Sequence, residues 1–239
     1  MRTTILMALF TQVAGATEPT ALELLTKTDD MMRGQSSSAT VVMDVRTNRY
    51  ERSMSMQMLS SGSERTLIRI LSPEREAGTV TLKVDDNIWN YLPKVDRTMK
   101  IPNGMMGGRW MGSHFNNSDL VNEQRMSDDY TFTMTGDEGS GWNLSLTPKP
   151  DAPVVWGRVE LDVGVDQLPT AARYFEEDGT LARTMSWSDV QDIEGRRVPM
   201  TMTLVPGDAP EEYTRLTYQE LCFDVDIPAN TFSLQALRQ

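Results

Sequence analysis

The sequence of 239 residues has one histidine, His114, and one cysteine, Cys222. Metal sites built from clusters of histidine and cysteine are therefore excluded, and no intramolecular disulfide can form. A Ser-His-Asp site would have to use His114, and the sequence contains no G-x-S-x-G motif. We expect Cys222, in the stretch "QELCFDV", to be a small buried side chain. These absences argue against an enzyme of the common nucleophilic or metal-dependent classes.

Positive charge is also scarce, because 23 basic residues face 34 acidic ones and the net charge is −11. So acidic a chain repels phosphate backbones and anionic lipid surfaces, and nucleic-acid binding is not expected. There is no phosphate-binding loop and no apolar run of the roughly 20 residues that a membrane-spanning helix needs. Acidic runs such as "SDDY" and "FEEDG" could hold a carboxylate pair for glycoside hydrolysis, but solvated turns explain them better. We expect no catalytic residue, cofactor or metal.

The first residues, "MRTTILMALFTQVAGA", have the pattern of a secretory signal. Arg2 precedes an apolar run over residues 5–10, and the small residues 14–16 form a cleavage site. We therefore predict a signal peptide at residues 1–16 and a mature chain that begins at Thr17. No cysteine stands at the cleavage site to carry a lipid, so the mature protein should be free in the periplasm. Loss of Arg2 leaves 22 basic and 34 acidic residues, a net charge of −12.

The order of predicted elements indicates one β-rich domain over residues 17–239. Thr20 and Glu23 form a capping box that starts a helix, with Leu22, Leu25 and Met32 as its apolar stripe. Roughly a dozen strands at hairpin spacing follow, with a short helix at "NNSDLVNE" and a helical segment at the C-terminus. A single antiparallel sheet of this size curls as its twist accumulates or splits in two. We expect a curved sheet with helices filling its concave face.

Methionine is abundant, with 17 residues, ten of them between Met31 and Met111. Its flexible, polarizable side chain suits ligands of variable shape. Met54, Met56 and Met58 alternate along one strand, and the loop "MMGGRWMGSHF" combines soft apolar residues with glycines. The alternative, an ordinary solid core without room for a ligand, explains a single methionine stripe better, but the stripe together with this loop favours a cavity with a movable cover. The predicted cavity and lid residues are Met54, Met56, Met58, Trp89, Tyr91, Met105, Met106, Trp110, Met111 and Phe115, with Gly104, Gly107, Gly108 and Gly112 as hinges.

Several uncommon motifs recur in order: "SP…GT", "WNYLPK", "R…KIP", "MM…WMGS" and "F-x-N-x-DL". In these motifs the sequence resembles the LolA-like outer-membrane lipoprotein-sorting protein family, from the first helix through the loop and more loosely to the "D…IP…F" ending. That family usually has an acidic residue where this chain has His114. The resemblance implies an unclosed half-barrel whose helices act as a plug or lid.

The resemblance also implies a periplasmic carrier that holds acyl chains between sheet and lid. Its partners would be a lipidated protein or another acyl-chain lipid, an inner-membrane transporter or permease and, where one exists, an outer-membrane acceptor. Such a carrier is expected to be a monomer. Two other readings stay open: a periplasmic sensor on a similar half-barrel that signals to a membrane partner, and a hydrolase with a carboxylate pair.

Overall fold

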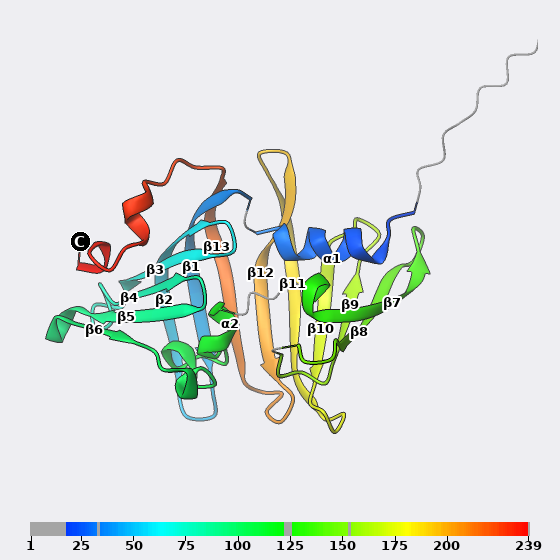
Figure 1. The fold of residues 1–239 in the computed structure, drawn as a ribbon, viewed down its shortest axis with the longest axis horizontal. Coiled ribbons are helices and arrows are strands. Elements are labelled where there is room, and N and C mark those ends of the chain that lie inside the picture. Colours follow the sequence, from blue (N-terminus) through cyan, green and yellow to red (C-terminus); the bar gives the residue numbers. More distant parts are fainter. Residues whose placement is uncertain (1–17, 33, 122–125, 153, 239) are drawn as a thin grey trace, which may run out of the picture.

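A computed structural model describes residues 18–32, 34–121, 126–152 and 154–238, so the predicted signal peptide lies outside the described residues. Its main element is one antiparallel sheet of thirteen strands in the order β6-β5-β4-β3-β2-β1-β13-β12-β11-β10-β9-β8-β7. The edge strands β6 and β7 are not paired with each other, so the sheet is an open half-barrel (Figure 1). This confirms the predicted fold class.

Nearly all strands are joined to their sheet neighbours by direct hairpins. The strands are β1 (Ser36–Arg46), β2 (Glu51–Ser61), β3 (Arg65–Ser72), β4 (Val80–Val84), β5 (Asn87–Leu92), β6 (Arg97–Lys100), β7 (Tyr130–Asp137), β8 (Gly141–Pro148), β9 (Arg158–Val163), β10 (Pro169–Phe175), β11 (Leu181–Ile193), β12 (Arg196–Pro206) and β13 (Tyr213–Phe223). The helices are α1 (Ala21–Asp30), α2 (Asn117–Val121) and α3 (Met126–Asp129), and the 3-10 turns are η1 (Pro93–Val95), η2 (Asn103–Met105), η3 (Trp110–Gly112), η4 (Ala229–Phe232) and η5 (Ala236–Arg238).

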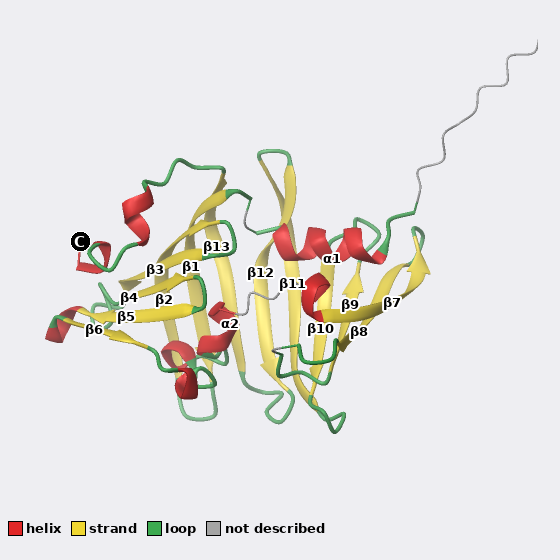
Figure 2. Ribbon diagram, viewed as in Figure 1, coloured by secondary structure: helices red, strands yellow, loops and turns green. Residues whose placement is uncertain are grey.

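Helix α1 begins at the capping box that the sequence predicted. The Thr20 backbone N–H donates to Glu23 Oε2 at 2.7 Å, and the Glu23 N–H donates to Thr20 Oγ1 at 3.3 Å. Leu25 is buried, but Leu22 is 52% exposed, and Leu24 takes its place against the sheet. The predicted stripe was therefore wrong at one position. Figures 1 and 2 show α1 and α2 in front of the sheet, on its concave face.

Strand register assigns side chains to the two faces of the sheet, because directly paired residues point to the same side. Met58 of β2 pairs with Ala39 of β1 and with Ile68 of β3, and these three side chains face α1 and α2. Met54 and Met56 have the same parity and are fully buried in the same cluster. The predicted inward orientation of the three methionines thus agrees with the register.

Trp89 and Tyr91 lie on the opposite, convex face, which corrects their predicted position. Trp89 pairs with Leu82, and Leu82 pairs with Leu67, all in a second cluster that the C-terminal side chains Phe232 and Leu237 cover. Alternation showed that Trp89 and Tyr91 share a face, but it could not show which face. This part of the sheet is buried on both sides, so apolar residues occupy both parities.

Cys222 is exposed, which corrects the expectation that it is buried. Its neighbours Leu221 and Phe223 both point to the concave face and are buried there. Alternation along β13 therefore turns Cys222 to the outside.

Candidate functional site

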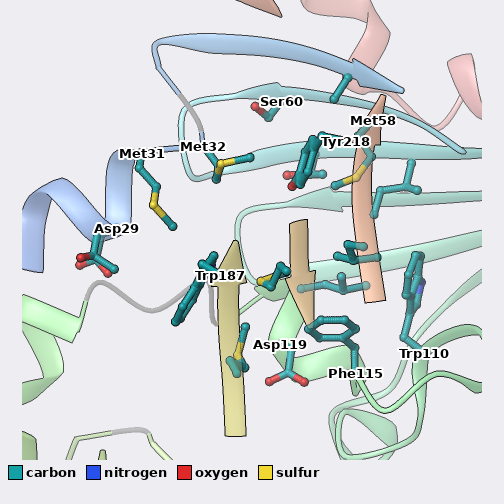
Figure 3. A pocket seen from close by; sticks show the side chains of 18 of the residues that line it. Asp29, Met31, Met32, Met58, Ser60, Trp110, Phe115, Asp119, Trp187 and Tyr218 are labelled. Atoms are coloured by element: carbon teal, nitrogen blue, oxygen red, sulfur yellow. The ribbon is translucent and has the colours of Figure 1, made fainter. Parts of the chain in front are cut away.

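A cavity of about 270 Å³ lies between the concave face of the sheet and the helices α1, α2 and α3. Figure 3 shows its side chains: Tyr218, Met58 and Phe115 converge on one space, with Ser60 and Asp119 toward opposite ends. The lining is mostly apolar and rich in sulfur and rings. Seven methionines line it, namely Met31, Met32, Met56, Met58, Met126, Met185 and Met202. The aromatic lining residues are Trp110, Phe115, Trp156, Tyr174, Trp187 and Tyr218.

Four of the ten predicted lining residues reach this cavity. They are Met56, Met58, Trp110 and Phe115. The two methionines come from the middle of β2, while Trp110 and Phe115 come from the loop between β6 and α2. Two segments about 50 residues apart in sequence therefore meet at one wall.

The other six predicted residues do not line the cavity. Met54 is buried in the concave core beyond it, and Trp89 and Tyr91 are on the convex face. In the loop, Met105 is 62% exposed, and Met111 packs against the core from its edge. Met106 is half-buried and is absent from the lining residues. The predicted lid thus divides into an inner end at Trp110 and Phe115 and an outer end at Met105.

The loop is fastened to the rest of the structure by hydrogen bonds. The indole Nε1–H of Trp110 donates to Thr81 Oγ1 at 3.1 Å, and the Tyr50 hydroxyl donates to the Gly112 carbonyl at 2.6 Å. The Trp110 backbone N–H donates to the Phe115 carbonyl at 2.8 Å, which closes the loop on itself. In this conformation the inner end of the loop is a plug in the core rather than a free cover.

Of the four glycines predicted as hinges, Gly112 alone has a left-handed backbone, at φ +70°. A side chain at Gly104 or Gly107 would meet nothing within 4 Å, and one at Gly108 would approach the Met105 carbonyl at 3.1 Å. Glycine is therefore required by conformation at Gly112. The role of the four as hinges stays a prediction.

His114 ties the same loop to β13. Its Nε2 lies 3.0 Å from Glu212 Oε2, its Nδ1 lies 2.9 Å from Thr214 Oγ1, and its backbone N–H donates to that hydroxyl at 2.9 Å. The hydrogen bond from the Asn48 backbone N–H, with a second from His114, holds the pKa of Glu212 below its usual value. His114 therefore has a structural role, which the sequence did not reveal.

The cavity wall contains an ion pair between Arg183 and Asp119. Arg183 of β11 donates from Nη1 and Nη2 to the two carboxylate oxygens of Asp119 on α2, each at 2.8 Å. Burial lowers the pKa of Arg183, but the hydrogen bonds and the charge of Asp119 outweigh that effect and raise it overall. Nearby, burial raises the pKa of Tyr130. These two groups therefore keep one charge state over the physiological range.

Hydroxyl groups form a polar row at the other end of the cavity. Thr66, Ser60 and Ser37 are paired across β3, β2 and β1 and all line the cavity, and the Ser37 and Ser60 hydroxyls lie 2.7 Å apart. The cavity is therefore apolar along its length, with hydroxyls at one end and the ion pair near α2.

Sequence reasoning missed the contribution of the second half of the sheet. Arg183, Met185 and Trp187 alternate along β11 and all line the cavity, as do Met202 of β12 and Tyr218 of β13. The alternation in "RTMSW" was a usable signal, of the same kind as that of Met54 to Met58. It shows that these residues share a face, but not that their face is the one opposite α1.

Within the described ranges, no group of three or more His, Cys, Asp or Glu side chains could hold a metal ion. Over the same ranges, none of the helices combines the length and the apolar character needed to cross a bilayer.

A family model described as "Uncharacterized protein" matches residues 62–239. No curated protein sequence gives a significant match to this chain.

Three crystal structures are similar over nearly their whole length. A domain from Vibrio parahaemolyticus, provisionally named as an outer membrane lipoprotein-sorting protein, is 21% identical with a TM-score of 0.76, covering 91% of this chain and 98% of that one. A DUF1329 family protein from Desulfovibrio piger is 22% identical with a TM-score of 0.79, covering 90% and 97%. A LolA superfamily protein from Nitrosomonas europaea is 21% identical with a TM-score of 0.73, covering 91% and 99%. At these identities the likeness establishes the fold.

Proposed function

From the premise that this chain belongs to the family whose model matches residues 62–239 and has the LolA-like fold, we propose that it is a carrier for acyl chains. The observation that carries the proposal is the methionine-rich cavity between sheet and helices. A binding site made of flexible apolar side chains accepts a hydrocarbon chain without requiring one fixed shape.

The size of the cavity sets how much ligand it takes in this conformation. Its volume of about 270 Å³ corresponds to about nine molecules of liquid water at about 30 Å³ each. A methylene group has a similar volume, so the cavity holds part of one acyl chain. At about 0.8 kcal/mol for each buried methylene, about eight of them supply roughly 6 kcal/mol. That is enough for binding, while larger cargo needs the helices to move.

We propose that the protein carries acyl chains and does not catalyse a reaction on them. The charged pair in the cavity wall is Arg183 with Asp119, and both carboxylate oxygens of Asp119 accept hydrogen bonds from the guanidinium. A carboxylate engaged by a guanidinium through both oxygens is a poor general base.

A proposal for the cargo and route is supported by the name of one similar structure, which refers to outer membrane lipoprotein sorting. We propose that the cargo is a lipidated protein or another acyl-chain lipid. The carrier would work in the periplasm, receive cargo from an inner-membrane transporter and deliver it to the outer membrane. The signal pattern at residues 1–16 supports this route.

The test is equilibrium binding of dansyl-labelled undecanoic acid to residues 17–239. Ala39 is buried on the concave face, lines the cavity and pairs with Met58, so Ala39→Phe places a ring in the ligand space. We expect it to weaken probe binding at least about tenfold, since displacing two methylenes already costs about 1.6 kcal/mol.

The matched control is Ser38→Phe, which puts the same side chain one residue away on the convex face, where Ser38 pairs with Cys222. It should leave probe affinity unchanged. Equal affinity of both variants and the unaltered chain, or no saturable binding at all, would refute the carrier proposal.

A further inference from the structure

A buried arginine in the wall of an acyl-binding cavity needs an explanation. Arg183 is 9% exposed, and a guanidinium in such a place is costly unless a partner anion accepts its hydrogen bonds. An apolar side chain of similar size would fill the wall without this cost. Asp119 is the partner in the present conformation, through both carboxylate oxygens.

The sheet side fixes the position of the guanidinium independently of Asp119. Its central carbon lies 4.6 Å from the ring centre of Trp156 and 4.6 Å from that of Tyr174. Its third donor, the Nε–H, is buried and has no hydrogen-bond partner among the described residues. The sheet side therefore holds the guanidinium of Arg183 in place, and its Nε–H is a donor that Asp119 does not use.

Asp119 belongs to the helix side of the cavity. It lies on the short helix α2, and its Oδ2 also accepts the Asn116 backbone N–H at 2.9 Å, which caps that helix. If α2 moves to admit a longer chain, the pair breaks and Arg183 is left buried without an anion. Leaving one partner of a buried pair without the other is strongly unfavourable, so opening is favourable only when another anion takes the vacated place.

We propose that Arg183 is the receptor for an anionic group on the ligand, a carboxylate or phosphate attached to the acyl chain, which replaces Asp119 and releases α2. This rests on the proposed function and adds the chemical class of the ligand. Exchange is favoured over addition, because the two oxygens of Asp119 already accept from both Nη1 and Nη2 of Arg183. A carboxylate or phosphate on the ligand can take this bidentate place only when Asp119 leaves it.

The test compares dodecanoate, dodecanol and acetate by isothermal titration calorimetry. Asp119→Asn removes the charge but keeps an oxygen to accept the Asn116 N–H. We expect it to raise the affinity for dodecanoate about tenfold, as a charge-assisted pair with a freed guanidinium would, and to leave dodecanol within about twofold. The double variant Asp119→Asn with Arg183→Met should bind both alike. Acetate should bind none of the three proteins.

A second readout uses the unaltered chain, so it holds even if a variant fails to fold. Dodecanoate, but not dodecanol, should speed amide hydrogen exchange of residues 117–120, because only the anion displaces Asp119. Equal responses to the two amphiphiles in both experiments would overturn the inference while leaving the carrier proposal standing. Acetate binding as tightly as dodecanoate to Asp119→Asn would also overturn it. If neither amphiphile binds the unaltered chain, the carrier proposal itself fails.

Discussion

Replacing Trp110 and Met105 by alanine, one at a time, tests whether the inner end of the loop is a packed plug in the core or a loose cover over the cavity. Trp110 is 4% exposed and Met105 is 62% exposed, although they lie only five positions apart in the sequence. Truncating a buried tryptophan typically costs about 3–5 kcal/mol, and an exposed side chain costs within about 0.5 kcal/mol. Trp110→Ala also leaves Thr81 Oγ1 without the indole N–H that donates to it. We expect a loss of about 4 kcal/mol for Trp110→Ala and almost none for Met105→Ala.

The assay is urea denaturation followed by far-ultraviolet circular dichroism, with the free energy of unfolding extrapolated to water. Trp110→Phe is the intermediate variant, because it keeps a ring in the core and removes the hydrogen bond to Thr81. Its cost should be about 1–2 kcal/mol. If Trp110→Ala costs less than about 1 kcal/mol, the inner end of the loop is not part of the core and the plug interpretation is wrong.

Three further predictions concern backbone, pH and the convex face. Gly112→Ala should lower the melting temperature, because φ is +70° and the new Cβ would lie 3.2 Å from the Tyr50 hydroxyl. The control Gly107→Ala should leave the melting temperature unchanged. Equal melting temperatures for the two variants would show that the backbone conformation at Gly112 does not require glycine. The lowered pKa of Glu212 means that its contribution to stability is present above the usual carboxyl pKa and is lost as pH falls through the lowered value. Glu212→Gln should therefore destabilise the chain at pH 7 and progressively less in acid; a pH-independent difference in urea midpoint would contradict this. Phe232→Ala should lower the free energy of unfolding by about 3 kcal/mol without changing acyl-probe affinity, since Phe232 covers the convex cluster; a parallel loss of probe binding would link that face to the ligand.

The sequence predicts those features of the structure that depend on residues close together in the chain. The capping box at Thr20 and Glu23 and the parity of Met54, Met56 and Met58 are local, and both agree with the structure. Trp89 and Tyr91 show the limit, because parity within a strand is local but the choice of face depends on what covers the sheet. There the cover includes Phe232, which is distant in sequence.

The candidate site was less predictable, because its walls come from distant segments. The Asp119 and Arg183 pair spans 64 residues, and no local pattern links the two positions. The composition of the loop "MMGGRWMGS" also does not predict which of its residues are exposed. It is rich in flexible apolar residues, but nothing in it shows that Trp110 is buried and Met105 is exposed. Tertiary contacts, here the hydrogen bond to Thr81, decide it.

The central claim, that an acyl chain occupies the cavity between sheet and helices, is tested most directly by photo-crosslinking. A fatty acid with a diazirine at the end of its chain is bound to the unaltered protein, irradiated and mapped by peptide mass spectrometry. We expect label on peptides that contain Met58, Phe115 or Trp187, and we expect an excess of unlabelled fatty acid to suppress it. Label that gathers on the convex face at Trp89 and Phe232, or that resists competition, would contradict the account.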